Sequence, residues 1–229
     1  MIGLIFSLLL SLYGLILIVK EYGNKTLVLP TVYASKPGQD ILLGLFCIIL
    51  IFYPGSHFLL IGLIIFKYCT KIHFIKFSKM INFKSSRQGI RWTVTFIKFW
   101  PVIFIFSMLS FFFFQDYPLQ SNVNQLRGDD TNQIISIIIS SLIIAPIIEE
   151  IVFRKFLYTG FKSNLGIGIS AILSSFIFAL IHLNIFSFTV LFIFGLFLCY
   201  CYEKYNTIYA PIWIHFMFNL FMVLSILAK

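Results

Sequence analysis

Two adjacent glutamates, Glu149 and Glu150, lie inside an otherwise uncharged apolar run of the chain. The residues before them read IISIIISSLIIAPII, and IVF follows before Arg154 brings the next charge. One charged side chain at the centre of a membrane helix costs roughly 2.5–3.5 kcal/mol on insertion scales, and two adjacent ones cost more. Any fold of this chain must therefore give the pair partners or a polar interior, and we interpret the pair as a functional site.

The composition defines the class of protein. Of 229 residues, 60% are hydrophobic and 11% are charged, whereas soluble domains carry about 25% charged residues. We therefore expect an all-α integral membrane protein, a polytopic transmembrane helical bundle of seven or eight spans in a bacterial cell membrane. The count depends on Pro54 and Gly55, which interrupt the second of the predicted spans, 2–19, 41–69, 92–114, 134–159, 165–183, 186–202 and 208–228.

The net charge of +9 has a membrane explanation. Basic residues concentrate beside the predicted spans, as the positive-inside rule expects, so no nucleic acid partner is predicted. The stretch 67–91 carries no acid and is interpreted as a cytoplasmic loop near anionic lipid headgroups. Its seven basic residues are Lys67, Lys71, Lys76, Lys79, Lys84, Arg87 and Arg91.

The two glutamates should differ in their surroundings. Glu150 and Arg154 are four residues apart, which places them on one helix face, where a guanidinium and a carboxylate pair well. Glu149 is rotated from Glu150 by about 100° and is free to point elsewhere. The structural alternative is that both glutamates only form an ion-pair network with Arg154. This network explains one carboxylate and leaves the other unexplained.

Polar residues recur in two later apolar stretches. His182 ends one of them, and His215 and Asn219 share a helix face in another. A single histidine in such a position is more often an interfacial residue than a catalytic one. An asparagine there can have a purely structural role, in an interhelical hydrogen bond. Pro146, three residues before Glu149, and Pro211, four residues before His215, are expected to loosen their helices.

The spacing allows the polar groups to meet. Glu149 and His182 are symmetric about the glycine-rich turn Gly160–Gly168, so an antiparallel hairpin would bring them to similar depth. Carboxylates, imidazoles and an amide can together activate water against a carbonyl group and stabilise the resulting oxyanion. A divalent metal such as zinc is the rival, although the sequence contains no HExxH motif.

Taken in order, these motifs resemble those of the CPBP family, which comprises type II CAAX prenyl endopeptidases and the Abi or bacteriocin self-immunity proteins. The family pattern is Glu-Glu-x-x-x-Arg, then Phe-x-x-x-His, then His-x-x-x-Asn or Asp. This chain fills every position, with Glu149, Glu150, Arg154, Phe178, His182, His215 and Asn219. The resemblance divides the chain into N-terminal helices and loops, 1–133, and a catalytic core, 134–229.

The resemblance implies a glutamate-dependent intramembrane peptidase without a required cofactor, although it leaves a metal open. It implies that Glu149 with His182 activates water, and that His215 and Asn219 form the oxyanion hole. Glu150, Arg154 and Phe178 are then supporting residues. The expected substrate is a membrane-associated peptide or a lipidated protein, with a role in maturing a bacteriocin or signalling peptide or in self-immunity.

Two other functions compete with this prediction. A non-catalytic immunity protein would bind a bacteriocin or its receptor at the membrane, and many family members are known only as immunity proteins. A small transporter would use the glutamate pair as a proton relay. The chain shows no repeated halves, which speaks against the transporter.

Overall fold

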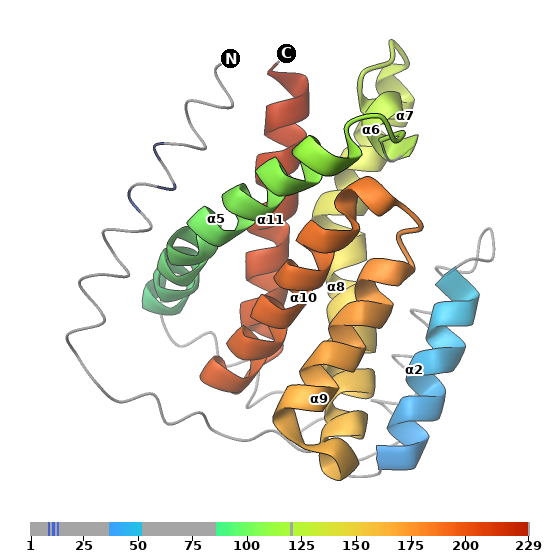
Figure 1. Ribbon diagram of the computed structural model, residues 1–229, viewed down its shortest axis with the longest axis vertical. Helices are drawn as coiled ribbons and strands as arrows, with labels where there is room; N and C mark the ends of the chain where they lie inside the picture. The colour runs from blue at the N-terminus through green and yellow to red at the C-terminus, as the bar shows by residue number, and fades with distance from the viewer. Residues whose placement is uncertain are drawn as a thin grey trace.

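The computed structural model describes residues 9, 11, 13, 37–51, 86–119 and 121–228. All regular elements of the described residues are helices, which confirms the predicted all-α helical membrane bundle. The elements, drawn in Figure 1, are α2 (Pro37–Ile51), α5 (Ser86–Phe114), α6 (Ser121–Leu126), α7 (Thr131–Ile139), the π-helix η1 (Ser140–Ile144), α8 (Ala145–Glu150), the π-helix η2 (Ile151–Tyr158), α9 (Thr159–Leu180), α10 (Ile185–Tyr205) and α11 (Tyr209–Leu227).

Within the described residues, four helical runs are long and apolar enough to cross a membrane. They are Arg87–Phe114, Thr131–Leu180, Ile185–Tyr205 and Tyr209–Leu227. Apart from residues 9, 11 and 13, the predicted span 2–19 lies outside the described residues, as does most of 41–69 with the interruption at Pro54 and Gly55. The choice between seven and eight spans therefore stays a prediction.

The run Thr131–Leu180 folds back on itself at Gly166. This residue has φ 75° and ψ 176°, a conformation that only glycine adopts without strain. Beyond the turn the chain returns beside η2, where the Ser174 hydroxyl donates to the carbonyl oxygen of Phe153 at 2.8 Å. The rings of Phe153 and Phe178 also meet, with centroids 5.3 Å apart. The predicted antiparallel hairpin is present.

The two prolines act differently from one another. Pro146 stands in the first turn of α8, directly after the wide π-helical turn of η1. A proline has no N–H for the preceding turn, and a π-helical turn is one way a helix accommodates that loss. Pro211 is the third residue of α11, where the backbone N–H groups have no helical partner anyway. The prediction that Pro211 loosens its helix is therefore wrong.

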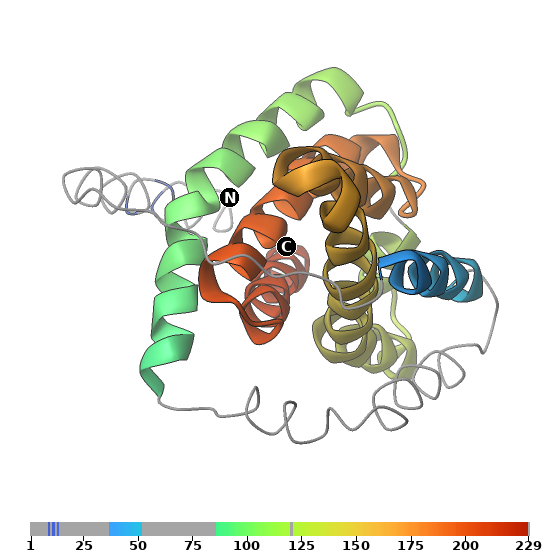
Figure 2. The same ribbon diagram turned by 90° about the horizontal axis from the view of Figure 1, so that it is seen from below.

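Helices α5 and α2 flank the bundle on opposite sides of α10 and α11 (Figure 2). On the α5 side, the rings of Phe99 and Phe197 stack at 3.8 Å, and a hydrogen bond joins the hydroxyls of Thr95 and Tyr205. On the other side, α2 packs against η2 at Gly44, where a Cβ atom would lie 2.7 Å from Cδ2 of Leu157. The helical run that carries the glutamates is thus packed against α2 at η2, while Ile143 and Ile147 on the same run are exposed.

Candidate active site

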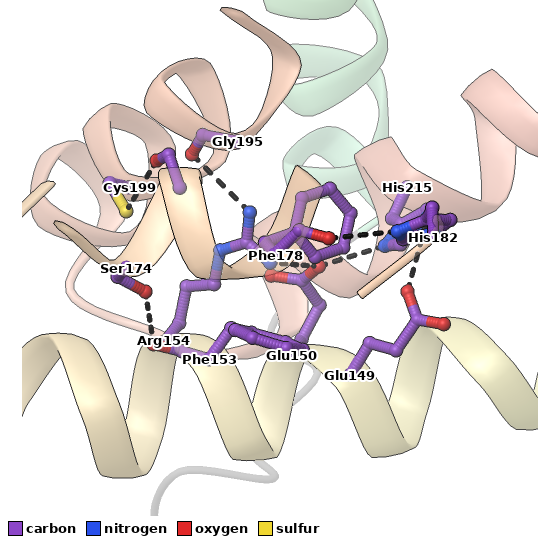
Figure 3. Close-up of polar contacts among 11 residues, drawn as sticks. Glu149, Glu150, Phe153, Arg154, Ser174, Phe178, His182, Gly195, Cys199 and His215 are labelled. Carbon is purple, nitrogen blue, oxygen red and sulfur yellow. Dashed lines mark hydrogen bonds and ion pairs between the residues drawn. The ribbon is translucent and has the colours of Figure 1, made fainter. Parts of the chain in front are cut away.

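Glu150 is the fully buried member of the glutamate pair. Its Oε1 accepts a hydrogen bond from Arg154 Nη1 at 2.9 Å and lies 2.8 Å from Nδ1 of His215 (Figure 3). Because a carboxylate oxygen accepts, the imidazole donates with a proton on Nδ1. The predicted pair of Glu150 and Arg154 is present, and His215 is a second partner that the helix pattern did not assign to Glu150.

Arg154 is fully buried and divides its guanidinium among three partners. Besides bonding Glu150, it donates from Nη2 to the carbonyl oxygen of Gly195 at 3.3 Å. Its central carbon lies 4.6 Å from the centroid of the Phe178 ring. A carboxylate, a carbonyl and an aromatic face together offset the cost of burying the cation.

The fully buried ring of Phe178 contacts both imidazoles. The ring centroid lies 5.0 Å from that of His182 and 5.8 Å from that of His215, and both contacts are edge-on. Its backbone oxygen lies 2.8 Å from Nδ1 of His182. Since a carbonyl only accepts, this imidazole also carries its proton on Nδ1, and Nε2 is the acceptor of the neutral ring.

Glu149 keeps part of its side chain accessible, with 18% exposed against 0% for Glu150. Its Oε2 lies 3.8 Å from Nε2 of His215, and the carboxylate points toward the imidazoles (Figure 3). Within the described part of the chain, no hydrogen bond joins Glu149 to His182. That Glu149 and His182 act together stays a prediction: both imidazoles lie on the side toward which the Glu149 carboxylate points (Figure 3), and its ion-pair contact is with His215.

Asn219 lies one turn after His215 on α11, as predicted, but its amide contacts another helix. Its Nδ2 donates to the backbone oxygen of Ser141 at 2.8 Å, in the π-helical turn η1. This bond uses one of the two amide hydrogens. The structure therefore brings Glu149, Glu150 and His215 together directly, while Asn219 ties α11 to the helix that carries the glutamates.

The donor set does not suit a metal ion. Among the residues that the structure describes, no group of three His, Cys, Asp or Glu side chains is arranged to hold one. The Glu150 oxygen that faces His215 is shared with the Arg154 guanidinium, whose positive charge opposes a metal cation at that oxygen. We therefore derive no step through a metal.

Several interactions were not predicted from the sequence. No local sequence motif predicts the bond of Arg154 to the Gly195 carbonyl or the two π-helices. The sequence places Glu203 at the end of an apolar stretch, as if solvated, yet it is 1% exposed and lies 2.5 Å from Lys162 Nζ. A charge at a helix end looks the same in the sequence whether it is solvated or paired.

Fold and site together define a helical integral membrane protein with a buried glutamate–histidine cluster. Residues 131–221 match the family model described as type II CAAX prenyl endopeptidase Rce1-like. Over 87 residues the chain is 31% identical to the "Putative membrane peptidase YdiL" of Bacillus subtilis (strain 168), a match covering 38% of this chain and 36% of that relative. The chain thus spans about a third of the length of the curated relative that it matches.

No solved structure matches the chain. The two matches confirm the resemblance to the CPBP family over the segment 131–221, which contains every predicted site residue.

Proposed function

We propose that this protein is an intramembrane endopeptidase in which Glu149 activates the water that attacks a peptide bond. The observation that carries the proposal is the contrast within the glutamate pair. Glu150 is buried and bonded by Arg154 and His215, whereas Glu149 is partly accessible and 3.8 Å from Nε2 of His215. A general base needs an accessible carboxylate beside groups that handle protons. The family match and the Bacillus relative support the peptidase class.

In the proposed reaction, Glu149 takes a proton from water as the oxygen bonds to the carbonyl carbon of the substrate. His182 assists Glu149 in removing this proton through Nε2, which is the acceptor of its neutral ring. The negative charge that forms on the carbonyl oxygen is stabilised by donors that are already oriented. The proton held by Glu149 then passes to the leaving amine, the C–N bond breaks, and water has been added across the peptide bond.

His215 is the proposed principal donor to that oxyanion. Its Nδ1–H is held by Glu150, so a second proton on Nε2 gives an imidazolium whose charge the carboxylate compensates. Nε2–H then faces the side where Glu149 lies. The second N–H of the Asn219 amide is the proposed further donor, since its first is bonded to Ser141.

Arg154 and Phe178 have supporting roles in this proposal. Arg154 compensates the buried charge of Glu150 and fixes the position of that carboxylate. The Phe178 ring contacts both imidazoles and limits their rotation. The proposed substrates are a membrane-associated peptide or a lipidated protein within the lipid bilayer, in peptide maturation or self-immunity.

The test compares peptides, by mass spectrometry, in membranes and medium of cells making the wild type, Glu149→Gln or Asp129→Asn at matched levels. Asp129 is exposed, so its variant removes one carboxylate away from the site. We expect a precursor to accumulate and its product to disappear with Glu149→Gln alone. Identical peptide profiles, with both the wild type and Glu149→Gln still protecting cells from a toxic peptide, would replace the peptidase by the non-catalytic immunity protein.

A further inference from the structure

A second buried polar cluster, which the proposed reaction does not use, joins η2 and α9 to α10. It consists of Tyr158, Lys162 and Glu203, each at most 2% exposed. Lys162 Nζ lies 2.5 Å from Glu203 Oε1, and the Tyr158 hydroxyl donates to the same oxygen at 3.0 Å. The Lys162 ammonium also lies 5.8 Å from the Tyr158 ring. Burying an ion pair is costly, so a stability gain alone is a weak explanation for it.

The cluster continues a line of contacts that begins at the candidate active site. Arg154 Nη2 donates to the Gly195 carbonyl, and Lys162 pairs with Glu203. Both contacts join residues 41 positions apart. Equal separation at these two points indicates that the segments 154–162 and 195–203 run in the same direction. A longitudinal shift of either segment would break both contacts together.

This register is not secured by the helix itself. Arg154 lies within η2, and Tyr158 is its last residue. π-helical turns are rare and usually single, so a segment of this kind depends on tertiary contacts. The Gly195 carbonyl holds the Arg154 side chain at one point, and Glu203 holds the C-terminal end of η2 and the start of α9.

The register reaches the site through three bonded residues. Arg154 donates to Glu150, and the same Glu150 oxygen accepts from His215 Nδ1. A displacement of η2 along α10 would move the Arg154 guanidinium. The Glu150 carboxylate could then keep its bond to only one of Arg154 and His215.

We propose that Tyr158, Lys162 and Glu203 are positioning residues that fix the register of η2 on α10 and thereby the orientation of the His215 imidazole. The inference rests on the geometry of the site and relates to catalysis only through the proposed function. Its test therefore uses a readout that does not require peptidase activity.

The experiment records ¹⁵N NMR of the imidazoles in histidine-labelled protein in detergent micelles, with the His215 resonances assigned from His215→Gln. Glu203→Gln keeps the size of the side chain and removes the charge. Tyr205→Phe is the matched control, because it also removes a polar group from α10. The hydroxyl of Tyr205 bonds Thr95 of α5 and no residue of η2. Thermal unfolding of each variant is measured in parallel.

We expect Glu203→Gln to shift the Nδ1 resonance of His215. Tyr205→Phe should leave this resonance in place, even if it lowers the unfolding temperature as much as Glu203→Gln does. The exchanged pair Lys162→Glu with Glu203→Lys should return the resonance toward the wild-type position. If Glu203→Gln does not fold, Tyr158→Phe, which removes only one hydroxyl, replaces it in the comparison.

An unmoved His215 resonance in the folded Glu203→Gln or Tyr158→Phe variant would overturn the proposal and leave the cluster a purely structural ion pair. An equal shift in Tyr205→Phe would overturn it too, since the resonance would then report general loosening. Neither result bears on the peptide profiles of Glu149→Gln, so the two proposals fail separately.

Discussion

The Nδ1 atom of His215 lies 2.8 Å from Oε1 of Glu150, a residue 65 positions earlier in the chain. This contact separates the roles of two glutamates that are neighbours in the sequence. Glu150 is committed to Arg154 and His215, and Glu149 is left with an accessible carboxylate. The helix produces the difference, because successive side chains point about 100° apart.

Arg154→Lys should destabilise the protein although it keeps the charge. One ammonium cannot supply the separate bonds of Nη1 to Glu150 and Nη2 to Gly195, nor the flat contact with Phe178. We expect unfolding in micelles to become easier by roughly 1–3 kcal/mol. Arg154→Met should cost more, about 3–5 kcal/mol, because it leaves an uncompensated buried carboxylate. Adding Glu150→Gln should recover part of that loss, and no recovery would contradict the ion-pair explanation.

Gly195→Ala should weaken the packing of α10 on α9. A Cβ atom at this position would lie 2.9 Å from Cβ and 3.0 Å from Oγ of Ser175. Overpacking of this kind costs about 1–3 kcal/mol, measurable as a lower unfolding temperature. Ser175→Gly should rescue the variant in part, because it removes both atoms and leaves the Ser175 Cα at 3.1 Å, whereas Ser175→Ala keeps Cβ and should not. Rescue by both second substitutions would show that the hydroxyl alone causes the clash.

Gly44→Ala and Gly38→Ala should have different effects, although both lie in α2. A Cβ atom at Gly44 would meet Leu157 at 2.7 Å, whereas one at Gly38 meets nothing within 4 Å. We expect Gly44→Ala to destabilise by about 1–3 kcal/mol. Gly38→Ala should be neutral or stabilise by roughly 0.5–1 kcal/mol through helix propensity. Equal unfolding temperatures for the two variants would contradict the packing of α2 on η2.

Asn219→Leu tests whether the amide serves the fold, the reaction or both. The substitution removes the bond to the Ser141 carbonyl, and interhelical bonds of this kind contribute about 0.6–2 kcal/mol. If Asn219 also donates to the oxyanion, product formation should fall about 10²–10³-fold, measured as product-to-precursor ratios by mass spectrometry. A lower unfolding temperature with unchanged product formation would restrict Asn219 to holding α11 against η1.

Much of the architecture follows from the sequence, because its causes are local. The predicted spans 186–202 and 208–228 correspond closely to α10, Ile185–Tyr205, and α11, Tyr209–Leu227, since apolar length sets them. The hairpin required only a glycine-rich turn, and Gly166 supplies the positive φ. The pair of Glu150 and Arg154 follows from helical spacing alone.

The tertiary structure decided which distant groups meet. Sequence spacing did not show that His215 would be a partner of both glutamates, and helix packing brings it to them. It also turns Glu203 from an apparently solvated helix end into the buried partner of Lys162. Hydrophobic length and helical period are properties of neighbouring residues, and the sequence determined them. The register and rotation of one helix against another depend on contacts summed over the whole interface, so only the folded chain fixes them.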